Sequence, residues 1–227
     1  MSSRILLVED DHDLRAAMAD ALTADALDVA VAADGRTALD ALAAAPHDLV
    51  LLDIGLGAGL DGIEVCRRLR GADGEVYVMV LTARGEEADV VAALEAGADD
   101  YVTKPIGIVE LRSRVRAALR RLGRGREDGP RRHGRLTVEP AAQRVLVGAT
   151  QVPVTRTEYE LLDAVLSARG AVCTRAELLR TVYGDDAYRD PRGVDVHVHH
   201  LREKLAQAGG DPAWVTTVRG VGYRLGP

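Results

Sequence analysis

Residues 49–53, LVLLD, form a run of four apolar side chains that ends in one carboxylate, Asp53. Four further short runs rich in apolar residues precede and follow it: ILLV (5–8), VAVA (29–32), VYVMVLT (76–82) and DYVT (100–103). Continuous apolar runs of this length are typical of strands that are buried on both faces of a parallel sheet. We therefore expect residues 49–53 to form an inner strand of such a sheet.

Amphipathic segments separate these runs, and each has the period and the end signals of a helix. They cover residues 12–25, 35–45, 62–70, 86–96 and 108–121. Asp-Gly pairs at 34–35 and 61–62 mark two of the starts. Five strands that alternate with helices predict an α/β domain over residues 1–121, with a doubly wound, five-stranded parallel sheet.

The pattern changes after residue 121. Residues 122–132, LGRGREDGPRR, are rich in glycine and charge and are predicted to be a linker. Short β-like pieces are expected at 135–138, 143–147 and 151–154, and helices at 157–168, 174–181 and 191–208. The chain closes with two β-rich arms in VTTVRGVGYRL (215–225). Three helices and a terminal hairpin predict an α+β winged helix-turn-helix domain over residues 133–227, with its last helix in the DNA major groove.

The net charge of −6 is divided unevenly between the two halves. Residues 1–121 carry 22 acidic and 13 basic side chains, net −9, whereas residues 122–227 carry 13 acidic and 16 basic side chains, net +3. This asymmetry indicates two modules with different partners, and the basic module is expected to meet nucleic acid. Because +3 is a small charge for a DNA-binding module, we expect binding to depend on dimerisation.

Composition excludes several other classes of protein. Apolar residues make up 47% and charged residues 28% of the chain, which is ordinary for a globular protein. No apolar run approaches the ~20 residues of a transmembrane helix, and MSSRILLVEDD at the start lacks a secretory pattern. We expect a cytoplasmic protein without a membrane partner, in which Cys66 and Cys173 are free, buried thiols.

Acidic side chains follow two of the predicted strands. Glu9, Asp10 and Asp11 come directly after the first strand, and Asp53 ends the third. The carboxyl ends of strands in an open parallel sheet converge on one crevice. Carboxylates gathered there repel one another unless a cation lies among them, and hard oxygen ligands favour Mg²⁺. Any one of these residues alone is as readily explained as a solvated loop residue or a helix cap, the role expected of Asp11 or Asp13.

A hydroxyl and an ammonium are expected opposite the carboxylates. Thr82 ends the fourth strand and Lys104 follows the fifth. The chain holds 27 arginines and only two lysines, so a lysine at this place points to a need for a compact point charge. Together with a metal, Thr82 and Lys104 favour a site for a small dianion such as a phosphoryl group.

Several strings in both halves agree with one family of proteins. ILLVEDD, LVLLD, VLTA and GADDYVTKP resemble the receiver domain of response regulators, which has a flavodoxin-like fold. LLRTVYG, RGVDVHVHHLREKL and TVRGVGYRL resemble the effector domain of the OmpR/PhoB subfamily. The resemblance implies a two-component regulator that takes phosphate from a sensor histidine kinase, dimerises through its receiver domain, and binds promoter double-stranded DNA beside RNA polymerase. Such a protein is not an enzyme beyond its own phosphotransfer and slow autodephosphorylation.

The resemblance also implies a role for each pocket residue. Asp53 is the implied phosphoacceptor, Lys104 contacts the phosphoryl group, and Thr82 hydrogen-bonds it. Tyr101 is the aromatic side chain that swings inward as Thr82 moves, and the Lys104-Pro105 bond is cis. The implied metal ligands are Asp10, Asp53, the backbone carbonyl of Gly55 and, through water, Glu9.

The segment after Asp53, IGLGAGLDG, departs from the family pattern. Gly57 stands where the family usually has proline, and the span from Asp53 to Gly62 is one residue longer than usual. A phosphate-binding P-loop is excluded because no Lys-Ser/Thr pair follows. We expect a flexible loop that loosens the Gly55 metal contact or alters kinase docking. Ile106 is a second departure, since the family commonly has phenylalanine there.

The predicted last helix of the second domain has one apolar stripe, formed by Val194, Val198, Leu201 and Leu205. The stripe is expected to pack on the domain core and leave the other face for DNA. By resemblance, Val196 and His200 touch bases, and Thr217 and Arg219 place the wing on the backbone or in the minor groove. Phosphate contacts are expected from Arg192, His197, His199 and Arg202.

Three histidines in four residues, His197, His199 and His200, raise a metal-site alternative. Only His197 and His200 share a face, with no cysteine or carboxylate beside them, so metal binding is not favoured. The hypothesis we prefer is DNA affinity that falls as pH rises, because phosphates favour the histidine cation.

Charged residues near the fifth strand and helix predict a dimer face. The acidic members are Glu95, Asp99 and Asp100, and the basic members are Arg112, Arg114, Arg116 and Arg121, around Val91, Leu94 and Val115. Each exposed ion pair alone contributes less than ~1 kcal/mol of stability, but the contributions of several pairs in one two-fold interface add up. The alternative interpretation is a charged surface that is simply solvated.

Two other functions compete with this interpretation. An aspartyl-phosphate phosphohydrolase also uses a strand-end aspartate, Mg²⁺ and a lysine, but it needs a general acid two residues after the nucleophile, where this chain has Gly55. A DNA-binding protein with an inactive receiver domain is disfavoured because Asp10, Asp53, Thr82 and Lys104 are all present.

Overall fold

The computed structural model describes residues 3–57, 59–71, 76–83, 87–122, 129–183 and 192–226. By its internal contacts the chain divides into two compact units, Met1–Gly123 and Arg124–Pro227. The first described strand of the second unit, β6, covers Arg131–His133 and so begins inside the predicted linker. Each unit is described by itself below.

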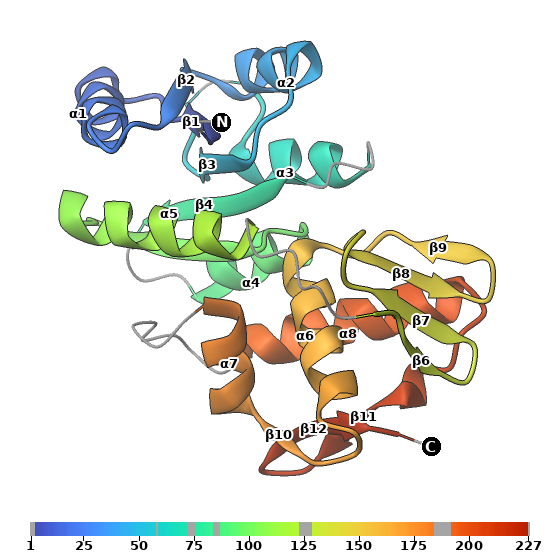
Figure 1. Ribbon diagram of the computed structural model, residues 1–227. Helices are drawn as coiled ribbons and strands as arrows, with labels where there is room; N and C mark the ends of the chain where they lie inside the picture. Colours follow the sequence, from blue (N-terminus) through green and yellow to red (C-terminus); the bar gives the residue numbers. More distant parts are fainter. Residues whose placement is uncertain are drawn as a thin grey trace. The chain divides into compact units, whose positions relative to one another are not determined.

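The first unit is built on a five-stranded parallel sheet, as the sequence predicts (Figure 1). The strand order is β2-β1-β3-β4-β5. The strands are β1 (Arg4–Val8), β2 (Asp28–Ala32), β3 (Leu49–Asp53), β4 (Tyr77–Ala83) and β5 (Asp100–Lys104). The chain passes from β1 outward to β2 and returns to β3 on the other side of β1. The residues that follow β1 and β3 therefore lie side by side.

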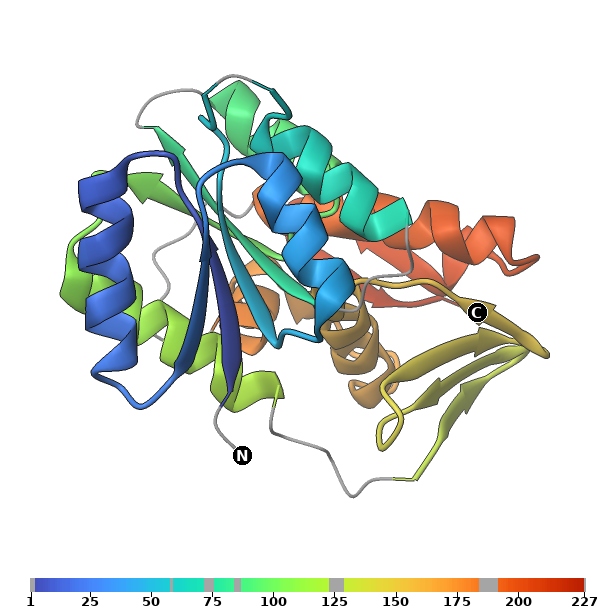
Figure 2. The ribbon, with the colours of Figure 1, turned by 90° about the horizontal axis from the view of Figure 1, so that it is seen from above.

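Five helices cover the two faces of this sheet. They are α1 (His12–Thr23), α2 (Gly35–Ala44), α3 (Gly62–Gly71), α4 (Glu87–Glu95) and α5 (Ile108–Leu122). Figure 2 shows α1 and α5 on one face, and α2 and α3 on the other. The prediction of a doubly wound α/β domain is confirmed.

Alternate side chains of each inner strand enter two separate cores. Leu51 packs with residues of α1 and α5, whereas Val50 and Leu52 pack with residues of α2, α3 and α4. All three are fully buried. Because both faces of a strand such as β3 are covered, its run is apolar at every position rather than at every second one.

The second unit begins with a four-stranded antiparallel sheet, ordered β6-β7-β8-β9. Its later strands are β7 (Leu136–Glu139), β8 (Arg144–Val147) and β9 (Thr150–Val152). Three helices follow: α6 (Arg156–Ser167), α7 (Arg175–Tyr183) and α8 (Arg192–Gln207). The sequence predicts these helices within two residues at each end, but it does not predict β6, which has only three residues and no apolar member.

A second antiparallel sheet closes this unit. It consists of β10 (Cys173–Thr174), β12 (Gly222–Leu225) and β11 (Val215–Val218) in that order, with a short 3₁₀ helix η1 (Pro212–Trp214) before β11. The β11–β12 hairpin is the predicted wing. Val194, Val198, Leu201 and Leu205 of α8 are all buried in the core of the unit, which confirms the predicted stripe.

The two cysteines are free. Cys66 is buried between α3 and the sheet, and burial raises the pKa of its thiol to about 11. The prediction that Cys173 is buried is wrong, because this residue is half-buried in the short strand β10; burial nevertheless raises the pKa of its thiol. None of the helices in the described parts of the chain is long and apolar enough to span a membrane.

Candidate functional site

The carboxyl ends of β1, β3, β4 and β5 meet at one edge of the first sheet. Asp53 is the last residue of β3 and pairs in register with Leu81, so that Thr82 lies one residue further along β4. Lys104 is the last residue of β5 and pairs with Ala83. Glu9 follows β1, whose neighbour is β3. Sheet topology alone thus gathers the residues that the sequence singles out.

Three carboxylates form the centre of this edge. Ligand oxygens of Glu9, Asp10 and Asp53 all lie within 4.8 Å of one another. Glu9 and Asp53 are buried, and Asp10 is exposed. Lys104 joins the buried pair, with its Nζ 2.6 Å from Glu9 Oε2 and 2.8 Å from Asp53 Oδ2.

The charges of this cluster do not balance, because three carboxylates face one ammonium. Burial raises the pKa of Glu9, and the nearby charge of Asp53 adds to this, although the hydrogen bond from Lys104 opposes it. Burial alone lowers the pKa of Lys104, but its hydrogen bonds to Asp53 and Glu9 outweigh that effect and the pKa is raised. The lysine is therefore a fixed cation. A cluster of oxygen ligands with surplus negative charge and one exposed member fits Mg²⁺ with its bound waters.

The loop after β3 approaches the carboxylates through its backbone. The Gly55 N–H donates to Asp53 Oδ1 at 3.1 Å, and the Gly57 N–H donates to Asp10 Oδ2 at 3.1 Å. Further along, the Gly62 α-carbon packs so closely that an added Cβ would lie 2.1 Å from the Asp53 carbonyl oxygen. Glycine is thus required at 62, where α3 starts directly against the end of β3.

The loop after β1 is fixed by the start of α1. Asp11 is the N-cap of that helix and accepts from the N–H groups of Asp13 and Leu14, each at 2.9 Å. These bonds lower the pKa of Asp11. Of the two residues predicted as possible caps, Asp11 and Asp13, the structure has Asp11 in this role. The Arg15 guanidinium donates to the carbonyl oxygens of Glu9 at 2.6 Å and Asp10 at 3.1 Å, a support that no sequence signal marks.

The remaining residues of the predicted site lie around this cluster. Thr82 is fully buried at the end of β4. Tyr101 is half-buried and packs against the core under α2, α3 and α4. The Lys104-Pro105 bond is cis, as predicted, and Ile106 packs against the core under α1 and α5.

In the second unit, α8 exposes part of the predicted DNA face. Val196 and His200 are half-buried, and His199 is exposed beside Glu203, with His199 Nε2 3.5 Å from Glu203 Oε1. Arg219 lies exposed in the turn of the wing. The side chain of Arg192 lies outside the described part of the chain.

The prediction that His197 reaches phosphates is wrong. Its side chain is buried in the domain, with Nε2 3.3 Å from the hydroxyl of Tyr183 at the end of α7. The physical reason is helical phase: His197 follows Val194 by three residues and precedes Leu201 by four, so it lies on the buried side of α8. It joins α7 to α8 and is not available to DNA.

Polar contacts fix the wing to α8. Arg202 donates through Nε to the Val215 carbonyl at 2.8 Å and through a terminal nitrogen to Thr217 Oγ1 at 2.8 Å. Asp195 accepts from the Tyr223 hydroxyl at 2.6 Å and from Arg175 Nε at 2.8 Å. Burial, followed by the hydrogen bond to Asp195, raises the pKa of Tyr223 to about 12. Sequence reasoning missed Asp195, Arg175 and Tyr223.

The second lysine of the chain also meets a buried carboxylate. Lys204 Nζ lies 2.7 Å from Glu158 Oε2, and Glu158 is buried. Glu158 also accepts from the Thr155 N–H, within the capping box that starts α6. This pair joins the last turn of α8 to the first turn of α6.

Two family patterns match the chain. Residues 5–116 match the response regulator receiver domain, and residues 149–225 match the C-terminal domain of transcriptional regulatory proteins. The response regulator MprA of Mycobacterium tuberculosis (strain ATCC 25618 / H37Rv) is 40% identical over 227 residues, which covers 99% of this chain and 98% of that protein. The chain is a response regulator of the OmpR/PhoB type. Proteins of this family regulate transcription and are not classed as enzymes.

Solved structures agree with this assignment. RitR mutant C128D is 28% identical, with a TM-score of 0.77 and 99% of each chain covered. The response regulator DrrB of Thermotoga maritima, described as an OmpR/PhoB homolog, is 28% identical with a TM-score of 0.53 over 100% of each chain. The order of receiver domain and winged-helix domain is therefore that of full-length members of the family.

Several residues of the predicted dimer face of this response regulator are buried or paired within the chain, whereas Glu95 is exposed and Val91 is half-buried. Asp99 is buried and pairs with Arg70 of α3, Leu94 is fully buried, and Val115 is buried in the core under α1 and α5. Arg112 and Arg116 both pair with Asp25 after α1. Asp100 is buried as well, and Arg114 pairs with Glu110 one turn earlier on α5. These arginines, which were expected to cross an interface, thus have partners within the chain: Asp25 is distant in sequence, whereas Glu110 lies on the same helix as Arg114.

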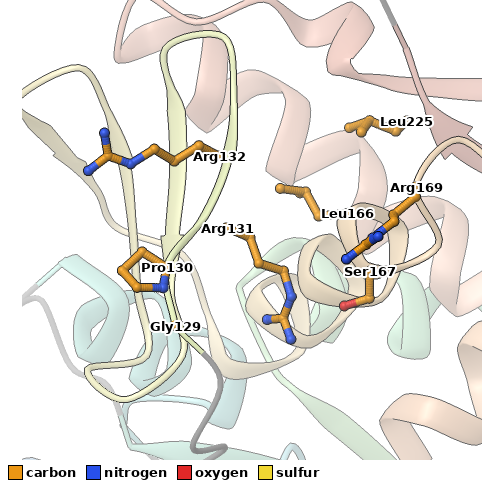
Figure 3. A pocket seen from close by; sticks show the side chains of 8 residues that line it. All are labelled: Gly129, Pro130, Arg131, Arg132, Leu166, Ser167, Arg169 and Leu225. Carbon is orange, nitrogen blue, oxygen red and sulfur yellow. The ribbon is translucent and has the colours of Figure 1, made fainter.

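The second unit of the response regulator also has an open pocket of about 730 Å³ (Figure 3). Its lining includes three arginines, Arg131, Arg132 and Arg169. Arg131 is paired with Asp163, and Figure 3 shows the Arg132 side chain directed away from Ser167 and Arg169. The arginines do not converge on one point, so the pocket is not built as an anion site.

Proposed function

We propose that Asp53 accepts a phosphoryl group from the phosphohistidine of a sensor histidine kinase, and that this step controls promoter binding. The observation that carries the proposal is the bridge of Lys104 between Glu9 and Asp53, beside the exposed carboxylate of Asp10. A buried nucleophile in contact with a fixed cation and a set of metal ligands suits phosphoryl transfer, whose catalysis is mainly positioning and charge neutralisation.

The chemical step is a substitution at phosphorus. A carboxylate oxygen of Asp53 forms a P–O bond as the P–N bond to the kinase histidine breaks, and the product is an acyl phosphate. Lys104 would neutralise an equatorial phosphoryl oxygen, and the Thr82 hydroxyl would donate to another. Asp10, Asp53 and the Gly55 carbonyl would hold Mg²⁺ directly and Glu9 through water, and the ion would supply further charge neutralisation.

We propose that the Asp53 phosphate promotes a homodimer through the receiver domain, with Tyr101 and Thr82 as the moving side chains. Dimerisation fits the small charge of +3 on residues 122–227, because two linked modules gain avidity without any new contact. The partners of the active dimer are promoter double-stranded DNA and RNA polymerase, in the cytoplasm. We name no interface residues, because several of the predicted set are buried or paired within the chain.

The proposed DNA surface combines α8 and the wing. Val196 and His200 are the proposed base contacts, while His199 and Arg219 are the proposed phosphate contacts, together with Arg192. Arg202 donates a hydrogen bond to Thr217, so we propose that these two residues contact DNA together at the junction of α8 and the wing.

Arg219→Ala tests this surface. If Arg219 contacts a phosphate, the substitution weakens DNA binding about equally for all sequences and lowers the slope of log affinity against log salt by about 1. The measurement is fluorescence anisotropy at several salt concentrations. The duplex is enriched from a random pool by the wild-type chain treated with acetyl phosphate.

Arg144→Ala is the matched control, because Arg144 is a half-exposed arginine in the first sheet of the same unit, paired with Glu139. It should leave both affinity and slope unchanged. Equal effects of the two substitutions, or failure of the wild-type chain to enrich any duplex, would contradict the proposed surface.

A further inference from the structure

The three carboxylates at the metal cluster are held in different ways. Glu9 and Asp53 are buried, and Lys104 contacts both. Asp10 is exposed, and among the hydrogen bonds of the described residues its carboxylate is reached by the Gly57 N–H, 3.1 Å from Oδ2. The orientation of the most exposed of the three carboxylates therefore depends on one backbone amide of the loop after β3.

Residue 57 is suited to this contact in two respects. A Cβ at Gly57 would lie 3.2 Å from Asp10 Oδ2, so the absence of a side chain allows the backbone to approach the carboxylate. A proline at this position would have no N–H to donate. Gly57, which was a departure from the family pattern in the sequence, thus supplies a hydrogen bond that the usual residue cannot make.

We propose that the Gly57 amide is a positioning group for Mg²⁺: it holds the Asp10 carboxylate beside those of Glu9 and Asp53. This inference rests on the proposed function, because it concerns the same metal site. A free exposed aspartate loses side-chain freedom when it binds a metal, and a hydrogen bond that already restrains it reduces that loss. A carboxylate has about four lone pairs on two oxygens, so it accepts the N–H and still coordinates the ion.

The consequence is a structural link between the metal and the loop after β3. The Gly55 N–H holds Asp53 and the Gly57 N–H holds Asp10, so two alternate amides of one loop orient two of the proposed ligands. The sequence predicts that this glycine-rich loop loosens the metal site. The contacts of Gly57 favour the opposite effect, in which the loop supports the site.

Metal affinity tests the proposal directly, without phosphorylation. Mn²⁺ binding to the full chain is followed by the loss of the electron paramagnetic resonance signal of free Mn²⁺, and Mg²⁺ is measured by competition. Gly57→Pro removes the N–H and is expected to weaken binding of both ions about tenfold or more, as for loss of other groups that orient a ligand. Gly57→Ala keeps the N–H, and its Cβ needs only a small shift of the exposed Asp10, so its affinity should stay close to that of wild type.

Asp10→Ala separates this proposal from the proposed function. If wild type and Asp10→Ala bind Mn²⁺ equally, the metal site itself is wrong and the inference is lost with it. If Asp10→Ala loses binding but Gly57→Pro does not, or if Gly57→Ala weakens binding as much as Gly57→Pro, the metal site stands and the role of the amide is wrong.

A second measurement does not depend on how Gly57→Pro folds. Labelling with ¹³C-carbonyl leucine and ¹⁵N-glycine selects the three Leu-Gly pairs of the chain, whose amides belong to Gly57, Gly123 and Gly226. Gly57→Ala identifies the first signal by its loss. The Gly57 amide should exchange with water more slowly in wild type than in Asp10→Ala, because its acceptor is removed. Equal exchange rates would overturn the proposal.

Discussion

Acetyl phosphate and Mg²⁺ are expected to label the wild-type chain on one residue, and Asp53→Ala is expected to reduce labelling to background. Asp53 is the last residue of β3 and one of two buried carboxylates in contact with Lys104, with its Oδ2 2.8 Å from Nζ and a place among possible metal ligands. Lys104→Ala should keep the acceptor but label about 100-fold more slowly, because one preorganised charge-stabilising group is removed. Phosphate-affinity electrophoresis and intact mass spectrometry measure both effects.

Asp40→Ala is the control for the labelling experiment. Asp40 lies on α2 of the same unit with an exposed carboxylate paired with Arg36, so its removal should leave the label unchanged. Labelling of Asp53→Ala at the wild-type level would exclude Asp53 as the acceptor.

Arg70→Met is expected to destabilise the receiver domain by about 3–5 kcal/mol, because it leaves a buried carboxylate without its cation. Asp99 is fully buried, and Arg70 is its ion-pair partner at 2.5 Å. Arg70 also donates to the carbonyl oxygens of Gly97 and Val76, each at 2.8 Å. Its loss therefore also removes one hydrogen bond to the turn between α4 and β5, at Gly97, and one to the residue before β4, Val76.

Arg68→Met is the matched control for Arg70→Met. Arg68 is on the same helix, α3, and pairs with Glu64 at 2.8 Å, but both members of this pair are exposed to solvent. An exposed pair of this kind contributes less than ~1 kcal/mol. The difference in stability between Arg70→Met and Arg68→Met therefore measures the effect of burying the ion pair, because both arginines lie on the same helix.

Cys66 provides the readout for the two arginine variants. Its thiol is fully buried with a pKa raised to about 11, so alkylation at pH 8 requires the receiver domain to open. A loss of 3 kcal/mol should speed alkylation about 150-fold in Arg70→Met. Urea unfolding followed by circular dichroism should show the same order of stability. Equal alkylation rates in the two variants would show that the buried pair is not needed.

The fold and the cluster of carboxylates and lysine at the sheet edge are predictable because local patterns determine them. The apolar runs at 49–53 and 76–82 report burial on both faces of a sheet, and the carboxyl ends of parallel strands converge whatever the intervening sequence. Asp53, Lys104 and Thr82 thus met through topology alone. The burial of His197 is also predictable, since its spacing from Val194 and Leu201 marks the buried side of α8. A stripe defined by aliphatic residues alone leaves this histidine out.

Contacts between distant segments were not predictable. Arg70 and Asp99 are 29 residues apart, and Asp25 and Arg112 are 87 apart, and nothing in a single sequence marks either pair. Asp99, Arg112 and Arg116 of the predicted dimer face are examples, because each has a partner within the chain that is distant in sequence. The Gly57 amide was missed for a related reason: a backbone donor carries no residue-type signal, and only the folded loop shows its acceptor.

The central claim is that phosphorylation of Asp53 controls DNA binding. The direct measurement is anisotropy of the enriched duplex with wild type and Asp53→Ala, each with and without acetyl phosphate and Mg²⁺. Phosphorylation should tighten binding of the wild type about tenfold or more through a dimer, and should leave binding by Asp53→Ala unchanged. No change in the wild type, or the same gain in Asp53→Ala, would show that phosphorylation of Asp53 does not control DNA binding.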